Sequence, residues 1–346
     1  FMEIVDEERE TSSFLQKNEK LLLFFYLCEE EKIFRDYIVE YINIRKFPPK
    51  DLLMIEHDWH TIQDKIKAGR AHELSEGDTF YLGACTKGKK GDNLRKQKGS
   101  PICAKQRAFS LKSSYLNTII ESFSKQEEEK ESILKDPSIL SKESFEEYIK
   151  NKFAAYIGLS PQQITEKLGV PLNIKSKGYL AKLARQVLGI KGNKIEEFEK
   201  ANVTMKVMRL QLNGTPKESI SFPAFKYNEI IEEDWEDSET LQMMDKKFFF
   251  VIFQYDKDGN LTLKKVMFWN IPFKDLDDDV RAVFNETKER ILNGNINHLP
   301  KISESLVAHI RPHGKNAKDT VEAPDGKKYM KKAFWLNAKY IAKQIQ

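Results

Sequence analysis

Lysine and arginine side chains are concentrated in two windows of this sequence. Residues 87–112 carry a net charge of +8 and residues 309–343 carry +6. Because the whole chain has a net charge of +4, its other residues are net −10. Clustered ammonium and guanidinium groups donate hydrogen bonds to phosphates and base edges, so the two windows indicate a polyanionic partner such as a nucleic acid. For either window alone, a solvated lysine-rich loop is the alternative.

The two windows occupy equivalent places in an internal repeat. Four pairs of landmarks align at offsets of 225 to 227 residues: Leu21 with Phe248, Gly69 with Gly294, Lys87 with His313, and Phe109 with Phe334. This period is too long for a solenoid, so we interpret the chain as two copies of one domain. A merely solvated loop has no reason to keep its charge in both copies, which favours a binding role.

Apolar patterning predicts both strands and helices. The runs LLLFFYL and FFFVIF are too short to cross a bilayer and predict buried strands, so we expect no membrane segment. Residues 55–66 keep helical spacing around Trp59, and Gly69 is a natural helix end; Trp59 and its equivalent Phe284 are predicted core residues. Ser160 with Gln163 predicts a capped helix start.

Three cysteines, Cys28, Cys85 and Cys103, have no metal-ligand spacing. An odd number of thiols without such spacing is typical of a reducing compartment, so we expect a cytoplasmic protein without a zinc site. We expect no signal peptide. The charged stretch 124–138 ends in Asp-Pro-Ser and indicates a boundary. We therefore expect a first domain at 1–125, a charged linker at 126–145 and a second domain at 146–346.

Several segments of the second copy, in order, carry a family resemblance: LSPQQITEKLGV, KGYLAKLARQVLG, EEFEKANVTMKV, HIRPHGKN and KKAFWLNAKYI. In the first copy, four segments match the later segments of the same family: ETSSFLQKNEKLLLFFYL, DWHTIQDKIKAGRA, YLGACTKG and AKQRAFSLKSSYL. On these residues the chain resembles the MutH and Sau-type family of GATC-specific endonucleases. The doubling resembles Sau-type type II restriction enzymes in particular. The resemblance implies a mixed α/β fold of two tandem restriction-endonuclease-like (MutH-like) domains, each a central mixed β-sheet flanked by helices.

The resemblance also implies a catalytic pattern of Asp, then Glu seven residues later, then Lys two beyond, around Mg²⁺. In the second copy, EEFEKANVTMKV resembles the catalytic strand and places Glu197, Thr204 and Lys206 at these positions. Thr204 departs from the pattern, because a neutral hydroxyl is a poor ligand for a hard cation. We expect the second copy to be catalytically inactive. Mg²⁺ is expected for the complete enzyme, with no metal bound to this chain.

The equivalent segment of the first copy falls before Phe1, so we expect the active site proper to lie outside this chain. One accessory group of that copy is predicted, Lys17, which matches an additional active-site lysine of the family. A solvated lysine ahead of a strand is the alternative for Lys17.

The resemblance implies that both copies recognise DNA. By the match to the family's recognition loop, Lys87, Arg311 and His313 are candidate readers of base edges in the major groove. Nine further basic residues are predicted phosphate contacts: Lys89, Lys90, Arg95, Arg107, Lys112, Lys315, Lys318, Lys331 and Lys332. The expected partner is double-stranded DNA containing GATC.

The leading hypothesis is thus that the chain is part of a type II restriction endonuclease, in which its second domain is a non-catalytic DNA-binding effector. Such an arrangement could support self-association or DNA looping. A free-standing, non-catalytic DNA-binding protein is the second hypothesis, and an RNA or tRNA binder is the third.

Overall fold

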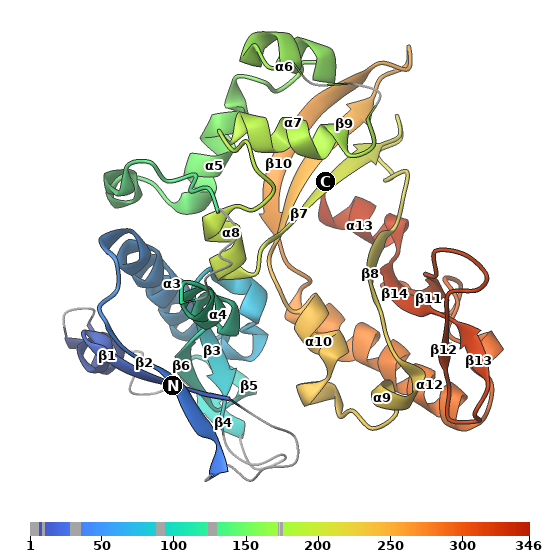
Figure 1. Ribbon diagram of the computed structural model, residues 1–346, viewed down its shortest axis with the longest axis horizontal. Helices are drawn as coiled ribbons and strands as arrows, with labels where there is room; N and C mark the ends of the chain where they lie inside the picture. The colour runs from blue at the N-terminus through green and yellow to red at the C-terminus, as the bar shows by residue number, and fades with distance from the viewer. Residues whose placement is uncertain are drawn as a thin grey trace. The chain divides into compact units, whose positions relative to one another are not determined.

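The computed structural model describes residues 7–8, 11–27, 36–87, 94–123, 130–171, 173 and 176–346. The chain divides into two compact units (Figure 1). Unit 1 comprises Phe1–Tyr148 with Ile190–Val203, and unit 2 comprises Ile149–Gly189 with Thr204–Gln346. Both units contain helices and strands in alternation, which confirms the predicted mixed α/β class.

The strands of unit 1 form three antiparallel pairs: β1 (Leu21–Leu27) with β2 (Ile38–Arg45), β3 (Leu82–Thr86) with β6 (Arg107–Leu111), and β4 (Leu94–Gln97) with β5 (Ser100–Lys105). Its helices are α2 (Ser13–Asn18), α3 (Pro49–Lys67), α4 (Ser113–Glu121), the start of α5 (Phe145–Ala154) and α8 (Glu196–Ala201), with 3₁₀ turns at Ala71–Glu73, Glu76–Asp78 and Pro137–Ser141. Within the described part of this unit, the strands pair antiparallel and a parallel pairing occurs only as the isolated bridge between Glu131 and Ile195. The central mixed sheet expected for the first copy is therefore not found there.

Unit 2 does contain a mixed sheet. β9 (Phe248–Tyr255) lies between β10 (Leu261–Trp269), which is antiparallel to it, and β7 (Thr204–Leu210), which is parallel. A second sheet has the order β11 (Ala308–Pro312), β14 (Lys332–Leu336), β8 (Ile220–Ala224), and β12 (Thr320–Glu322) pairs with β13 (Lys328–Met330). The helices are the rest of α5, α6 (Pro161–Leu168), α7 (Tyr179–Val187), α9 (Tyr227–Ile230), α10 (Glu239–Met244), α11 (Phe273–Asp275), α12 (Arg281–Leu292) and α13 (Ala338–Gln344), with short turns at Trp235–Asp237, Leu276–Val280 and Ile296–His298.

The internal repeat reappears as a repeated order of elements. The series α2, β1, β2, α3, β3, β4, β5, β6, α4 of unit 1 matches α10, β9, β10, α12, β11, β12, β13, β14, α13 of unit 2. The backbone pairing agrees as well, because the Lys87 amide donates to the Gln106 carbonyl and the His313 amide donates to the Lys331 carbonyl, both at 2.8 Å. The same order of elements therefore recurs in the two units, while their assignment as two copies of one domain stays a prediction.

The local signals for helix ends are also confirmed. Ser160 and Gln163 form a reciprocal capping box at the start of α6. Gly69, after α3, and Gly294, after α12, both have left-handed backbone at φ 70° and 73°, where a side chain would be strained. Trp59 and Phe284 are core residues, at 1% and 0% exposure.

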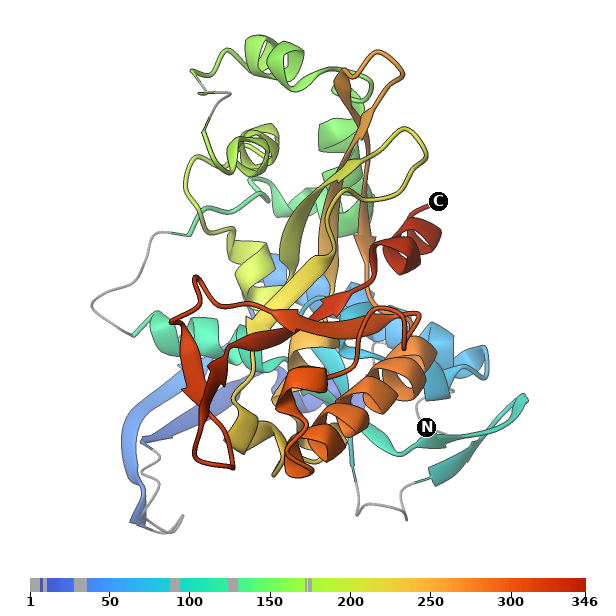
Figure 2. The same cartoon turned by 90° about the vertical axis from the view of Figure 1, so that its right-hand side faces the viewer.

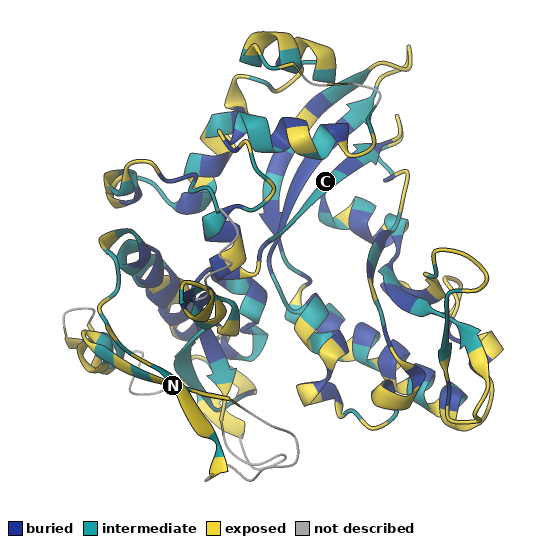
Figure 3. Cartoon of the chain, viewed as in Figure 1, coloured by how far each residue is buried: buried dark blue, intermediate teal, exposed yellow. Residues whose placement is uncertain are grey.

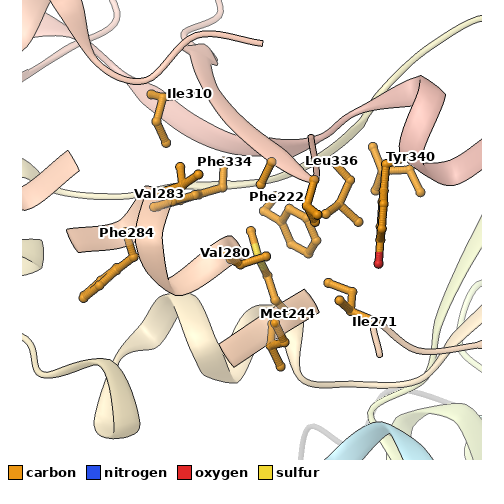
Figure 4. Packing of buried hydrophobic residues seen from close by; sticks show 14 of the residues in the cluster. Phe222, Met244, Ile271, Val280, Val283, Phe284, Ile310, Phe334, Leu336 and Tyr340 are labelled. Atoms are coloured by element: carbon orange, nitrogen blue, oxygen red, sulfur yellow. The ribbon is translucent and has the colours of Figure 1, made fainter. Parts of the chain in front are cut away.

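One large cluster of apolar side chains forms the core of unit 2 (Figure 4). Phe334 and Leu336 of β14 and Phe222 of β8 pack there with Met244 of α10 and Phe284 of α12. Phe248 and Phe250 extend the cluster to the mixed sheet, with Phe222 and Phe248 ring centroids 6.2 Å apart. The core therefore fixes β11 and β14 against the rest of unit 2.

The two copies differ in how their first hairpin is covered (Figure 3). In unit 2, α5, α6 and α7 lie along the face of the sheet that carries Phe249, and Phe153 of α5 packs on that ring at 5.8 Å. In unit 1, the matching face of β1 and β2 carries Leu22 and Phe24, which are 54% and 48% exposed, opposite the exposed Ile44 and Ile42. Within the described residues, this apolar face has no covering layer.

The division into units differs from the predicted boundaries in two places. Of the expected linker at 126–145, residues 130–145 are described and contribute Ile133, Leu140 and Phe145 to the buried residues of unit 1. Ile190–Val203, expected in the second domain, also belongs to unit 1, where the Lys200 ammonium lies 2.8 Å from the Asp51 carboxylate. Because these segments are mostly charged, their sequence did not indicate the few apolar and ion-paired residues that hold them in unit 1.

A buried carboxylate joins α3 to β3 in unit 1. Asp58 is 2% exposed, and its oxygens accept hydrogen bonds from the amides of Phe80, Tyr81 and Leu82 at 2.6–2.9 Å. Burial raises the pKa of Asp58, while the nearby Lys112 charge and the three amides oppose that rise. The strand that leads to Lys87 therefore depends on this carboxylate for its starting point.

We predict that Asp58→Ala lowers the free energy of unfolding by on the order of 3 kcal/mol, because three buried amides lose their acceptor and Lys112 loses a nearby negative charge. Urea denaturation followed by circular dichroism measures the change. Asp64→Ala, at an exposed position of the same helix, is the matched control and should change stability by less than about 0.5 kcal/mol. Equal effects of the two substitutions would contradict this role of Asp58.

Candidate nucleic-acid interface

The hairpin-like pair β11 and β14 has two chemically different faces. Side chains alternate along a strand, so Ile310 and Phe334 point into the core of unit 2. His309, Arg311 and Trp335 occupy the opposite face, with His309 directly across from Trp335. Burial of the apolar face thus determines which side chains the strand pair presents on the other.

Arg311 is the exposed cation of this face. Its guanidinium carbon lies 4.9 Å from the centre of the Trp335 ring, a cation–π geometry. No carboxylate in the described part of the chain forms an ion pair with Arg311, so its donors are available to an external acceptor. The exposed His313 ring meets Trp335 edge-on, with centroids 5.6 Å apart. The two candidate base readers of this copy are therefore brought together around one half-buried indole.

Below this group lies a buried histidine. His309 is 1% exposed and its Nδ1 bonds to the Asn337 amide oxygen, while its Nε2 and the Trp335 Nε1 are buried without a partner. Burial lowers the pKa of His309, and the Arg311 charge lowers it further although the Asn337 bond opposes both. His309 is therefore a neutral support of the face at physiological pH.

The loop from β11 to β14, which includes the strand pair β12 and β13 (Figure 2), is organised by Asp319. Its carboxylate accepts from the Lys315 amide at 2.9 Å and pairs with the Lys331 ammonium at 2.7 Å. Lys315 and Lys318 remain exposed. Of the four phosphate contacts predicted here, Lys315 and Lys318 are accessible and Lys331 is partly neutralised by Asp319.

The prediction that Lys332 contacts a phosphate is corrected. Lys332 is half-buried, burial lowers its pKa, and its ammonium donates to the Ile296 carbonyl. This lysine joins β14 to the turn at Ile296–His298, so it is a structural residue of unit 2 and not a phosphate contact.

In unit 1, two predicted phosphate contacts are corrected in the same way. The Arg107 guanidinium donates to the Ala84 and Leu74 carbonyls at 2.7 and 2.8 Å. Lys112 is 7% exposed, and its ammonium donates to the Glu76 and Thr79 carbonyls at 2.6 and 2.7 Å. Both cations satisfy backbone groups inside the unit, which the sequence alone could not distinguish from an exposed charge.

The other basic residues predicted in unit 1 lie at its surface or outside the described residues. Lys87 is exposed at the end of β3, and Arg95 is exposed on β4 with a 2.7 Å bond to the Gln106 side chain. Lys89 and Lys90 lie outside the described residues. Lys17 is exposed on α2, which packs through Phe14 on Phe109 of β6 at 5.6 Å.

The positions assigned to a degenerate catalytic pattern lie on two different elements, α8 and β7. Glu197 is 1% exposed on helix α8 of unit 1, where it accepts from the Ser132 hydroxyl and from the Ile133 and Leu134 amides. Thr204 and Lys206 lie on β7 of unit 2. The expectation that EEFEKANVTMKV is one strand was therefore wrong for its first half, which is helical, and Glu197 is a structural acceptor.

Within the described residues, no group of three or more His, Cys, Asp or Glu side chains is placed to hold a metal ion. The same part of the chain contains no helix that is both long and apolar enough to span a bilayer.

The sequence aligns over its full length with the type II restriction enzyme Sau3AI of Staphylococcus aureus. Identity is 32% over 398 residues, and the match covers 81% of that relative. The chain belongs to the Sau3AI family of type II restriction enzymes. No family model matches the chain. Family membership agrees with the implied resemblance to restriction endonucleases, while the MutH-like assignment of each unit stays a prediction.

Two features of this Sau3AI-family chain were not found from its sequence. The first is the stack of Arg311 on Trp335, because the sequence did not say whether that indole faces inward or outward. The second is Lys246, which lies just before β9 and shares a face of the sheet with Phe248. Counting residues along β11 and β14 from the buried Phe334 would have placed Trp335 on the face opposite the core.

We predict that the stability of the Sau3AI-family unit 2 falls as the pH drops below about 6.5, since the unfolded chain then binds a proton that buried His309 excludes. Above that pH, His309 does not change the free energy of unfolding. Below it, excluding the proton from His309 lowers the free energy of unfolding by at most about 1.4 kcal/mol per pH unit. Urea unfolding at pH 7.5 and 5.5 tests this. His309→Gln should flatten the dependence, whereas His298→Gln, at an exposed position, should not. The prediction fails if both variants follow the wild-type slope.

Proposed function

We propose that this chain recognises double-stranded DNA at GATC and that unit 2 acts as a DNA-binding effector without catalytic activity of its own. Its family of type II restriction enzymes supports DNA as the partner. The observation that carries the proposal is the exposed Arg311 guanidinium, unpaired within the described residues and stacked on Trp335. A cytoplasmic location is part of the same proposal.

A stacked guanidinium suits guanine in the major groove. Arginine presents paired N–H donors that match O6 and N7 of that base. The contact with Trp335 restricts the plane of the guanidinium, which reduces the entropy lost when it binds. Lys315 and Lys318, exposed in the loop that follows, can neutralise phosphates on either side of the base contact.

The donor set of unit 2 does not fit Mg²⁺. Thr204 offers a neutral hydroxyl and Lys206 a cation at the positions implied for a metal carboxylate and its lysine. Mg²⁺ prefers anionic oxygen ligands. We therefore propose Mg²⁺ as a cofactor of the complete enzyme only, with unit 2 binding DNA without it.

A non-catalytic DNA-binding unit can act as an effector by occupying a second site. Tethering raises the effective concentration of the catalytic part near that site, through a DNA loop or through self-association. A free-standing DNA-binding protein is the second candidate, and the same exposed Arg311 supports it.

We predict that Arg311→Ala weakens binding to a GATC duplex by on the order of 1 to 3 kcal/mol and binding to a scrambled duplex much less, because a base contact is lost. Fluorescence anisotropy with both duplexes measures the difference. Lys315→Ala is the control for a phosphate contact and should weaken both duplexes equally. Equal losses for Arg311→Ala would reassign it to the phosphate backbone.

We predict that the purified chain does not cleave a GATC-containing plasmid in the presence of Mg²⁺, because Thr204 stands where the implied pattern has a metal carboxylate. Agarose electrophoresis of the plasmid after incubation is the measurement. GATC-specific cutting that persists through repurification would contradict the prediction and place a functional metal site in this chain.

A further inference from the structure

Two lysines lie side by side on the core-facing side of the mixed sheet in unit 2. Lys206 of β7 is directly opposite Phe250 in the parallel register, and Thr204 is opposite Phe248. The Lys246 ammonium lies 5.9 Å from the centre of the Phe248 ring, and the Phe248 and Phe250 rings stack at 6.0 Å. Thr204, Lys206 and Lys246 therefore converge on one small region at the start of β7 and β9.

This region is held in place by the backbone. The Thr204 amide donates to the Lys247 carbonyl at 3.1 Å, which joins the start of β7 to the residue before β9. Further along the same face of β7, Met208 and Leu210 are buried in the core of unit 2. Lys206 thus projects from the sheet and Lys246 from the bend that leads into it, so a ligand that binds both meets a preorganised site.

The charge of the region is unbalanced. No carboxylate of the described residues forms an ion pair with Lys206 or Lys246, and both side chains are partly buried. Burial lowers the pKa of each ammonium, and the charge of Lys206 lowers that of Lys246 further. A bound anion would relieve both the lost hydration and the mutual repulsion, so the region favours an anionic ligand.

We propose that Lys206, Lys246 and Thr204 form a metal-independent binding site for one phosphodiester group of the DNA backbone. Two ammonium groups and a hydroxyl can donate to the two unesterified oxygens of such a group. The neutral side chain of Thr204 is essential to the arrangement, since a carboxylate there would pair with the lysines and repel the phosphate. The proposal rests on the proposed function that unit 2 binds DNA.

The test uses the whole purified chain with EDTA present and measures duplex affinity by fluorescence anisotropy over a range of salt concentrations. Lys206→Met and Lys246→Met each keep the length of the side chain and should weaken GATC and scrambled duplexes alike, on the order of tenfold. Each should also lower the slope of log affinity against log salt by about 1. Lys264→Met, at an exposed position of β10, is the matched control, and thermal denaturation checks that all variants fold.

A second pair of variants tests the need for a neutral Thr204. Thr204→Glu should weaken both duplexes at least as much as either lysine variant, whereas Thr204→Gln, of similar size and no charge, should bind like the wild type. If the wild-type chain binds neither duplex, the proposed function fails. If the wild type binds but Lys206→Met and Thr204→Glu match the Lys264→Met control, DNA binding stands and the phosphodiester site is overturned.

Discussion

The burial of β9 from Phe248 to Phe253 is the constraint on which unit 2 depends. Its residues from Phe248 to Phe253 are at most 1% exposed, so the strand must be covered on both faces and paired along both edges. Helices α5 to α7 cover one face, and the cluster that contains Phe222 and Phe334 covers the other. That cluster in turn fixes β11 and β14. The positions of the exposed Arg311 and of Lys206 and Lys246 thus follow from the burial of a continuous apolar strand.

The same apolar pattern has a different outcome in unit 1. β1 resembles β9 in sequence and in its hairpin partner, yet Leu22 and Phe24 are exposed where Phe249 and Val251 are buried. The apolar pattern of a strand shows that its face can be buried. Whether the face is buried depends on a second layer of elements that packs against it. Within the described residues, unit 2 has that layer and unit 1 does not.

The order of helices and strands could be predicted from the sequence because repeated landmarks, capping residues and apolar runs act over short distances. Ser160, Gly69 and the strand at Phe248 were therefore found correctly. The assignments that failed depended on tertiary partners: Arg107 and Lys112 donate to carbonyls far along the chain, and Glu197 binds amides more than sixty residues away. A one-dimensional pattern identifies the residue type, whereas only the fold shows whether its hydrogen bonds are already satisfied.

Available charge therefore matters more for binding than counted charge. Window 87–112 has the larger formal charge, but Arg107 and Lys112 are already satisfied within unit 1. Window 309–343 has the smaller charge, but Arg311, Lys315 and Lys318 are exposed, and no acid in the described chain pairs with their side chains. A phosphate binds most favourably to a cation that is partly desolvated and has no ion pair within the protein, because no existing ion pair must be broken. Lys206 and Lys246 meet this condition without belonging to either window, so a search by charge density alone passes over them.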